Sequence, residues 1–196
     1  MTTEKHVKAI LDRTFWILQS VYESQTETDT DFNPSRMSRI IFPKYKGEKG
    51  RRICEQELRF VFVEQLNEEI KQGWDVFYSV ETPTDNAYSF SNGEPKCTED
   101  GRSGATDLVI HDNTSKRIVL LEFKAKTKEC EKDLYKLANE EIDHKYFVNM
   151  LENVDQDTFN SLHEKIEKHL SHDIKFAFWS LGEKRDVTKE VIEYKT

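Results

Sequence analysis

Residues 104–126 read GATDLVIHDNTSKRIVLLEFKAK, in which two apolar, β-branched runs flank a short polar turn. Runs of this composition on either side of a turn predict a β-hairpin. With the turn centred after Thr114, Val109 faces Leu120 across the hairpin. This segment decides the fold, because it supplies two neighbouring strands of a central sheet.

The same register sets His111 opposite Ile118 and Asp107 opposite Glu122. Residues opposed in this way have Cβ atoms roughly 5 Å apart, and like charges at that separation repel each other. Lys124 follows on the face of Glu122, because side chains alternate along a strand. A cation is therefore expected between the two acids, and carboxylate ligands suit Mg²⁺. An edge-strand salt bridge is the plainer alternative.

The order Asp107, fourteen residues, then Glu122-Phe123-Lys124 resembles the motif of the PD-(D/E)xK nuclease superfamily, with Thr106 at the position of the usual proline. The resemblance implies an α/β fold with a restriction-endonuclease-like core, a mixed central β-sheet flanked by helices. It implies catalytic roles for Asp107, Glu122 and Lys124. It also implies one Mg²⁺ on Asp107, Glu122 and the backbone carbonyl of Phe123, with Mn²⁺ as a substitute.

Members of that superfamily often carry one more acid on a helix before the sheet, and residues 51–70, RRICEQELRFVFVEQLNEEI, are placed to supply it. Apolar residues recur there at helical spacing and predict a core-facing helix. Glu57 borders that face, and Glu55 borders it on the other side. We expect Glu57 to be catalytic and to help hold a second metal ion, with Glu55 as the second choice. A solvated helix flank is the alternative for either glutamate.

A cationic stretch precedes this helix. The net charge of −8 counts against indiscriminate nucleic-acid binding, which needs a positive surface. Residues 44–52, KYKGEKGRR, supply such a surface locally. The expected DNA-binding residues are Lys44, Lys46, Lys49, Arg51 and Arg52, with Arg102 and Lys126 extending the patch. A solvated connecting loop is the alternative interpretation.

The length of 196 residues suits one domain spanning 1–196. We divide it into an N-terminal helical extension and basic loop over 1–50, a nuclease-like core over 51–182 and a C-terminal edge segment over 183–196. An amphipathic helix is expected over 7–22, a strand over 75–82 ending at Pro83, and a polar loop over 84–104. If that loop covers the substrate, Tyr88 or Phe90 would stack on a base. The alternative is an insert with these aromatic residues tucked under it.

Beyond the hairpin, one or two helices are expected over 128–154 and a further helix over 157–170. An apolar strand is expected over 174–182, and a last edge strand over 186–194. No paired-histidine metal motif, CxxC pair or phosphate-binding glycine loop occurs in the sequence. The charges of Asp12 and Arg13 exclude a signal peptide, and no apolar run has membrane-spanning length, so a cytoplasmic protein is expected.

The function predicted from these patterns is Mg²⁺-dependent hydrolysis of phosphodiester bonds, with DNA as the substrate and partner. Endonucleolytic cutting is the expected mode, a homodimer is one option, and no membrane partner is expected. The main alternative is a non-catalytic nuclease-fold module that binds DNA or regulates another protein. A second alternative is an interaction protein in which the hairpin charges form a surface salt bridge.

Overall fold

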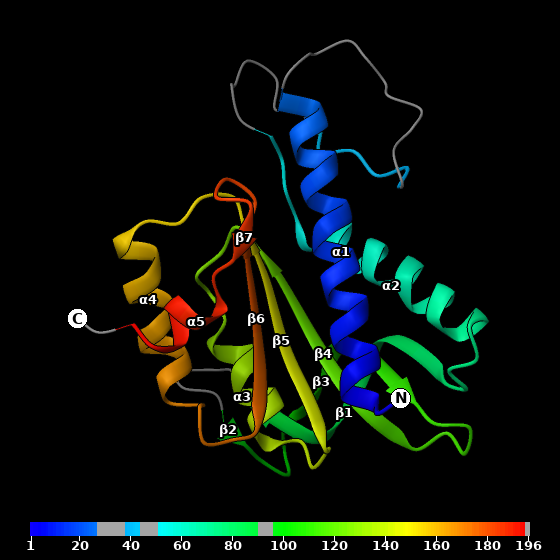
Figure 1. Cartoon of the computed structure of the whole chain (residues 1–196). Coiled ribbons are helices and arrows are strands. Elements are labelled where there is room, and N and C mark those ends of the chain that lie inside the picture. Colours follow the sequence, from blue (N-terminus) through cyan, green and yellow to red (C-terminus); the bar gives the residue numbers. More distant parts are fainter. Residues whose placement is uncertain (27–37, 44–50, 90–95, 195–196) are drawn as a thin grey trace.

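The computed structural model describes residues 1–26, 38–43, 51–89 and 96–194. Its strands form one seven-stranded sheet in the order β2-β1-β3-β4-β5-β6-β7 (Figure 1). The strands are β1 Phe77–Ser89, β2 Lys96–Cys97, β3 Arg102–His111, β4 Arg117–Ala125, β5 His144–Leu151, β6 Ile174–Ser180 and β7 Arg185–Asp186. The helices are α1 Thr3–Thr26, α2 Glu55–Lys71, α3 Glu131–Asn139, α4 Gln156–Glu167 and α5 Thr188–Ile192.

The sheet is mixed. Strands β2, β1, β3 and β4 are antiparallel neighbours, whereas β4, β5 and β6 run parallel, and β7 returns antiparallel to β6. The predicted α/β class with a mixed central sheet flanked by helices is therefore confirmed. None of the described helices has the length and apolar character that a membrane crossing needs.

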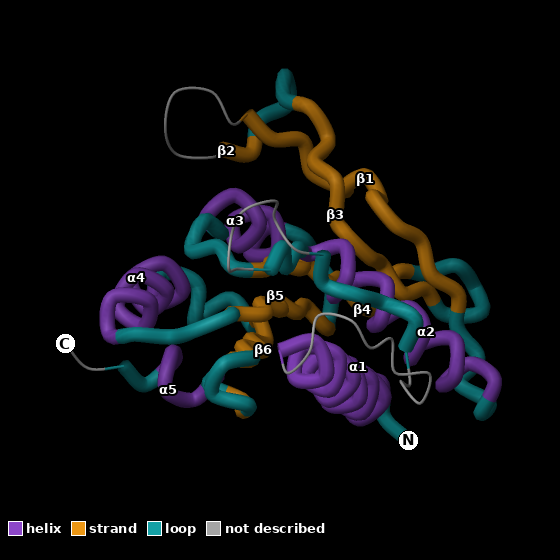
Figure 2. Tube along the Cα trace, turned by 90° about the horizontal axis from the view of Figure 1, so that it is seen from above, coloured by secondary structure: helices purple, strands orange, loops and turns teal. Residues whose placement is uncertain are grey.

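Two layers of helices cover the sheet. Helices α1 and α2 lie on one side of the central strands, and α3 and α4 lie on the other (Figure 2). Because side chains alternate along a strand, β4 contributes to both layers. Phe123 packs in the core under α1 and α2 with Phe62, whereas Leu120 packs with Leu134 and Leu162 in the core under α3 and α4.

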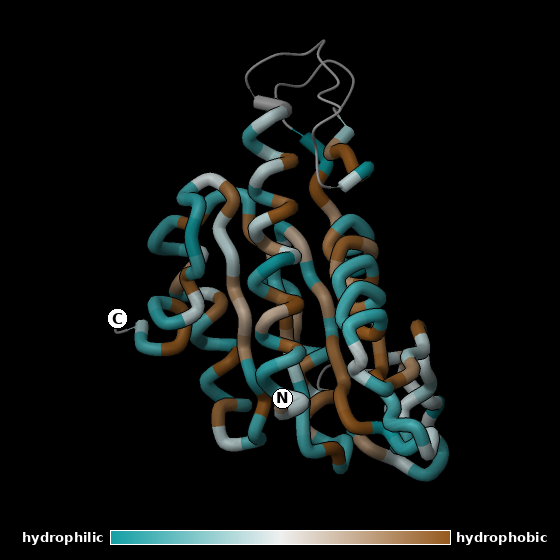
Figure 3. The backbone as a smooth tube through the Cα atoms, turned by 45° about the vertical axis from the view of Figure 1, so that its right-hand side comes forward, coloured by the Kyte–Doolittle hydropathy of each residue, from teal (hydrophilic) through white to brown (hydrophobic). Residues whose placement is uncertain are grey.

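Helix α1, predicted as part of an N-terminal extension, belongs to the main core. Apolar and polar residues alternate along it, as Figure 3 shows, and its apolar side is buried. A buried charge cluster joins it to α2, since Glu69 lies 2.6 Å from Arg13 Nη2 and 3.2 Å from His6 Nδ1. The His6 ring also stacks on Trp74 at a centroid distance of 4.5 Å.

The β3–β4 hairpin has the predicted pairing of Val109 with Leu120. Nearer the turn the prediction was wrong, because His111 pairs with Arg117, one residue short of its expected partner. The turn accounts for the shift: the Asp112 carboxylate accepts hydrogen bonds from two backbone N–H groups within it. This register shift lies at the tip of the hairpin. The pairs farther from the turn, Val109 with Leu120 and Leu108 with Leu121, keep the predicted register.

Within the polar segment 84–104, which was expected to be a loop, the described residues 84–89, 96–97 and 102–104 are strand. β1 continues through Pro83 to Ser89, and its register against β3 shifts between Pro83 and Ala87. A register irregularity accommodates proline, which lacks a donor for the ladder. Tyr88 is 2% exposed and its hydroxyl lies 2.7 Å from a carboxylate oxygen of Glu140. Tyr88 is therefore a packing residue, and Phe90 lies outside the described residues.

The expected helices over 128–154 were partly wrong. α3 ends at Asn139, and β5 occupies His144–Leu151 at the centre of the sheet. A strand buried on both faces has a continuous apolar run and lacks the alternation that identifies half-buried strands. The edge strand predicted over 186–194 was wrong for most of its length. Strand β7 covers only Arg185–Asp186, and Thr188–Ile192 forms the helix α5. The helix over 157–170 and the strand over 174–182 are confirmed as α4 and β6.

Candidate active site at the ends of β3 and β4

The two acids of the hairpin interact with each other. The β3–β4 ladder ends at the pair of Leu108 with Leu121, one position before the expected pairing of Asp107 with Glu122, and the charge of Asp107 acts on Glu122. The backbone N–H of Phe123 donates a hydrogen bond of 2.7 Å to Asp107 Oδ2. Glu122 is 1% exposed, which makes it the more deeply buried acid of the pair.

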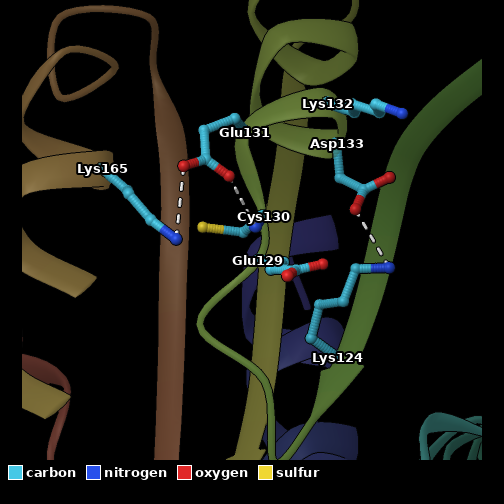
Figure 4. A pocket seen from close by; sticks show the side chains of 7 residues that line it. All are labelled: Lys124, Glu129, Cys130, Glu131, Lys132, Asp133 and Lys165. Carbon is cyan, nitrogen blue, oxygen red and sulfur yellow. Dashed lines mark hydrogen bonds and ion pairs between the residues drawn. The ribbon is translucent and has the colours of Figure 1, made fainter. Parts of the chain in front are cut away.

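Lys124 extends from β4 to acids of two helices. Its Nζ lies 3.0 Å from Asp133 Oδ2 of α3, a contact drawn in Figure 4, and 3.5 Å from Glu55 Oε2 of α2. Burial alone lowers the pKa of Lys124, but the carboxylates of Asp133 and Glu55 outweigh burial and raise the pKa well above the usual lysine value. Lys124 is therefore a permanent cation at neutral pH.

A second lysine, absent from the sequence-based prediction, reaches the same acids. Lys136 of α3 is 8% exposed, and its Nζ lies 2.7 Å from Glu122 Oε1 and 3.0 Å from Asp133 Oδ1. It also donates a hydrogen bond of 2.6 Å to the carbonyl oxygen of Ala105. The spacing of Asp133 and Lys136, three positions apart on one helix, is the sequence signal that could have identified the pair.

The pKa of Glu122 is set by its burial and by three neighbouring charged groups. Burial raises the pKa of Glu122 well above its ordinary value, the Lys136 ammonium opposes that effect, and the carboxylates of Asp133 and Asp107 add to it. The pKa of Lys136 is also raised, because Glu122 and Asp133 outweigh the opposite effect of burial. The contact between Lys136 and Glu122 is an ion pair, because the carboxylates of Glu122 and Asp133, both within 3.0 Å of Nζ, favour the ammonium form of Lys136.

Buried oxygens at this end of the sheet are incompletely bonded. Among the described residues, Glu122 Oε1 accepts no hydrogen bond of good geometry despite its ion pair, and Asn149 Oδ1 has no hydrogen-bond partner. Asn149 pairs with Lys124 in the β4–β5 register and is fully buried. Buried polar atoms are normally bonded. Glu122 Oε1 meets this need through the Lys136 ammonium at 2.7 Å, whereas Asn149 Oδ1 has no protein partner among the described residues.

Arg59 of α2 is a further charged residue that the sequence-based prediction did not include. Its guanidinium forms an ion pair with Glu81 and lies 3.9 Å from Asp107 Oδ1. Its side chain is 14% exposed. Burial raises the pKa of Asp107, whereas the Phe123 N–H and the Lys124 ammonium lower it.

Glu57, the predicted helical acid, lies at the start of α2 in a capping arrangement. Its Oε2 accepts a hydrogen bond of 2.9 Å from the backbone N–H of Cys54, and its Oε1 lies 3.2 Å from Arg52 Nη1. Cys54 occupies the N-cap position, and Glu57 occupies the third helical position of a capping box. Glu55, the second choice, is the acid of this helix whose carboxylate contacts Lys124.

The predicted DNA-binding residues are only partly described. Lys44, Lys46 and Lys49 lie outside the described residues. Arg51 is 9% exposed and Lys126 Nζ approaches its carbonyl oxygen at 3.4 Å. Lys126 also lies 2.5 Å from Glu152, and Arg52 bonds to the capping carboxylate of Glu57. Arg102 is exposed at the start of β3, where it pairs with Tyr88.

A pocket of about 620 Å³ opens beside the acid cluster (Figure 4). Its volume lies in the range of ligand-binding pockets. Lys124 and Asp133 belong both to the pocket wall and to the cluster described above. The lining residues are Lys124, Glu129, Cys130, Glu131, Lys132, Asp133 and Lys165.

The ligand atoms that Asp107 and Glu122 offer are of the type that a hard divalent cation prefers. Asp107 and Glu122 offer carboxylate oxygens, and a buried oxygen of Glu122 lacks a hydrogen bond of good geometry. Within the described ranges, no group of three or more histidine, cysteine, aspartate or glutamate side chains is arranged to hold a metal ion. Mg²⁺ is commonly bound through one or two carboxylates with water and substrate phosphate, so Asp107 and Glu122 are the residues that could hold such an ion here.

Comparisons with known proteins assign no family to this chain. No protein-family model matches the sequence. No curated protein and no solved structure matches it significantly.

Proposed function

We propose that the chain is a Mg²⁺-dependent nuclease of the PD-(D/E)xK type, with a restriction-endonuclease-like core, that hydrolyses phosphodiester bonds in DNA within the cytoplasm. The observation that carries the proposal is the gathering of Asp107, from the middle of β3, with Glu122 and Lys124, from the C-terminal half of β4. Contacts of Lys124 with acids of α2 and α3, together with the burial of Glu122, make this part of the sheet a densely charged and partly buried site.

In this proposal Asp107, Glu122 and the backbone carbonyl of Phe123 hold the metal ion. Bound Mg²⁺ would activate a water molecule as nucleophile and neutralise charge that develops on the phosphate. The raised pKa values of Asp107 and Glu122 support such a role, because burial and neighbouring carboxylates disfavour their charged forms unless a cation is near. The hydrogen bond from Phe123 orients Asp107 for that contact.

Lys124 acts in this scheme as a fixed positive charge. Its raised pKa makes it a poor base at neutral pH, so we assign it to binding a phosphate oxygen and stabilising the charge of the transition state. Of its two partners, Glu55 is 3.5 Å away with a side chain that is 43% exposed, and its contact is the one that an incoming phosphate can replace more easily.

The substrate assignment draws support from the surroundings of Lys124. The adjoining pocket has the volume to take part of a nucleotide. The three lysines of its wall are balanced by three acids of the same wall, so the support comes from the volume and from the Lys124 ammonium at its edge. Arg102, exposed on the β1–β3 arm, and the cationic stretch 44–52 would supply further phosphate contacts.

One observation favours a second candidate, a nuclease-fold module that binds DNA without cutting it. Both lysines of the cluster are already paired with acids, and the described residues contain no ready-made group of three metal-ligating side chains. Such a module would bind DNA in a salt-dependent manner without metal-dependent turnover.

Cleavage assays with matched variants test the proposal. The wild type and Glu122→Gln are incubated with supercoiled plasmid, linear duplex and RNA in Mg²⁺, Mn²⁺ or EDTA. We expect metal-dependent DNA cutting by the wild type and a loss of about 100-fold or more in the variant. DNA retention without cutting would favour the binding module, and equal cutting by both proteins would remove the site assignment.

A further inference from the structure

We propose that Lys136 is a positioning residue that holds the Glu122 carboxylate in place when no metal ion is bound and competes with the metal ion for it. This inference rests on the proposed function, because it concerns the same acid cluster. It makes metal binding an exchange in which the Lys136 ammonium leaves Glu122. The affinity of the site for a divalent cation is then set by a residue that is not itself a ligand.

The contacts of Lys136 support this role. Its Nζ lies 2.7 Å from Glu122 Oε1, the oxygen that lacks a hydrogen bond of good geometry. Asp133 Oδ1 at 3.0 Å and the Ala105 carbonyl at 2.6 Å complete the surroundings of the ammonium. A lysine ammonium and a divalent cation make the same demand on these oxygens, so the two cannot share Glu122 Oε1.

The backbone of β3 makes room for this lysine. A Cβ at Gly104 would lie 2.9 Å from Cδ of Lys136, which is closer than ordinary van der Waals contact. The missing side chain at Gly104 therefore lets the aliphatic part of Lys136 pass over β3 toward Glu122. The space left at Gly104 therefore helps to set the position of the Lys136 ammonium. A methyl group added there, as in Gly104→Ala, would displace the ammonium without changing any charge.

Removing Lys136 has two expected effects. Glu122 would remain buried without a cation, and breaking a buried ion pair on one side is strongly destabilising. A metal ion would then meet no competing ammonium and would relieve the isolated carboxylate, so it should bind more tightly. An ion pair that serves only to attach α3 to β4 would produce the first effect without the second.

Lys145 provides a matched control. It is 8% exposed, as Lys136 is, and its Nζ lies 3.4 Å from the carbonyl oxygen of Glu140. Lys145→Met therefore removes a buried lysine of the same fold from a different set of contacts. We expect it to leave metal affinity unchanged.

The experiment is calorimetric titration of Mn²⁺ into the full chain without DNA, for the wild type, Lys136→Met, Lys136→Arg, Gly104→Ala and Lys145→Met. We expect Lys136→Met to lower the dissociation constant by about tenfold or more, which is a difference of about 1.4 kcal/mol. Gly104→Ala should change it in the same direction by a smaller factor. Lys136→Arg should bind close to the wild-type affinity, because a cation is restored.

The outcomes separate this inference from the proposed function. Equal Mn²⁺ affinity in the wild type and folded Lys136→Met would overturn the inference and leave the metal site intact. Differential scanning calorimetry establishes that each variant is folded. If Lys136→Met fails to fold, Gly104→Ala still tests the inference, because it retains every charged residue of the site. Absence of Mn²⁺ binding in every variant would overturn both the inference and the metal site of the proposed nuclease.

Discussion

Asp107 Oδ2 accepts a hydrogen bond of 2.7 Å from the backbone N–H of Phe123, which ties the acid of β3 to the backbone of β4. The bond leaves Asp107 Oδ1 as the oxygen nearer Arg59, at 3.9 Å. Asp107 is therefore oriented by the fold itself and not by a ligand. Orientation of this kind by strands and backbone groups is what a precise binding site requires.

The two glutamates at the start of α2 should separate stability from site function. Glu57→Ala should lower the free energy of unfolding by about 0.5–2 kcal/mol, because it removes a capping interaction. Glu55→Gln should change stability little and lower the KM for DNA, because the Glu55 carboxylate competes with phosphate for Lys124. Chemical denaturation and cleavage rates measured on both variants check the two effects.

The opposite result would revise the assignment of the helical acid. A Glu57→Ala protein with normal stability and lost cutting would place Glu57 in the catalytic machinery, as first predicted. Glu57→Gln serves as the control for side-chain size, since an amide oxygen can still accept the N–H of Cys54.

The charge of Lys124 should persist over the whole practical pH range. Because neighbouring carboxylates raise its pKa, no inflection in the pH–rate profile between about pH 6 and 10 should belong to Lys124. Lys124→Met should reduce the cutting rate by about 100-fold or more at every pH in that range. An inflection that disappears in Lys124→Met would instead identify the lysine as the base.

The charge cluster between α1 and α2 should make stability pH-dependent. Burial raises the pKa of Glu69, but hydrogen bonds from Arg13 and His6 outweigh burial and lower it overall. A lowered pKa stabilises the fold above the unfolded-state value, and this contribution is lost as the pH falls through the folded-state value. Glu69→Gln should cost about 1–3 kcal/mol at pH 7, measured by urea unfolding.

Repeating the urea series at lower pH provides the check on the sign. The stability difference between the wild type and Glu69→Gln should shrink as the pH falls below about 4, because the carboxyl is then protonated first in the unfolded chain and, at lower pH, in the folded chain. A difference that stays constant down to pH 3 would exclude the ionised carboxylate as its cause.

The hairpin could be predicted from sequence because its information is local. Alternating apolar residues on both sides of a polar turn set the register that pairs Val109 with Leu120 and Leu108 with Leu121, next to the two acids. The turn itself was mispredicted, because the Asp112 side chain takes part in the backbone bonding of the turn. Periodicity alone carries no information on such a contact.

Strand β5 and the α3 residues of the site could not be predicted in the same way. β5 is buried along almost its whole length, so its apolar run has no strand period. Asp133 and Lys136 reach the site only because α3 packs over β4, a tertiary relationship that no short motif records. The choice between Glu55 and Glu57 likewise depended on which glutamate caps the helix.

Thermal unfolding of the wild type and Asp107→Asn in a Mg²⁺ titration, with plasmid cutting recorded in the same buffers, tests the central claim most directly. Asparagine keeps an acceptor for the Phe123 N–H and removes only the charge. The account predicts that Mg²⁺ raises the melting temperature of the wild type, that it does so far less in Asp107→Asn, and that cutting is lost in the variant. Equal stabilisation and equal cutting in the two proteins would contradict a metal-dependent nuclease site at Asp107.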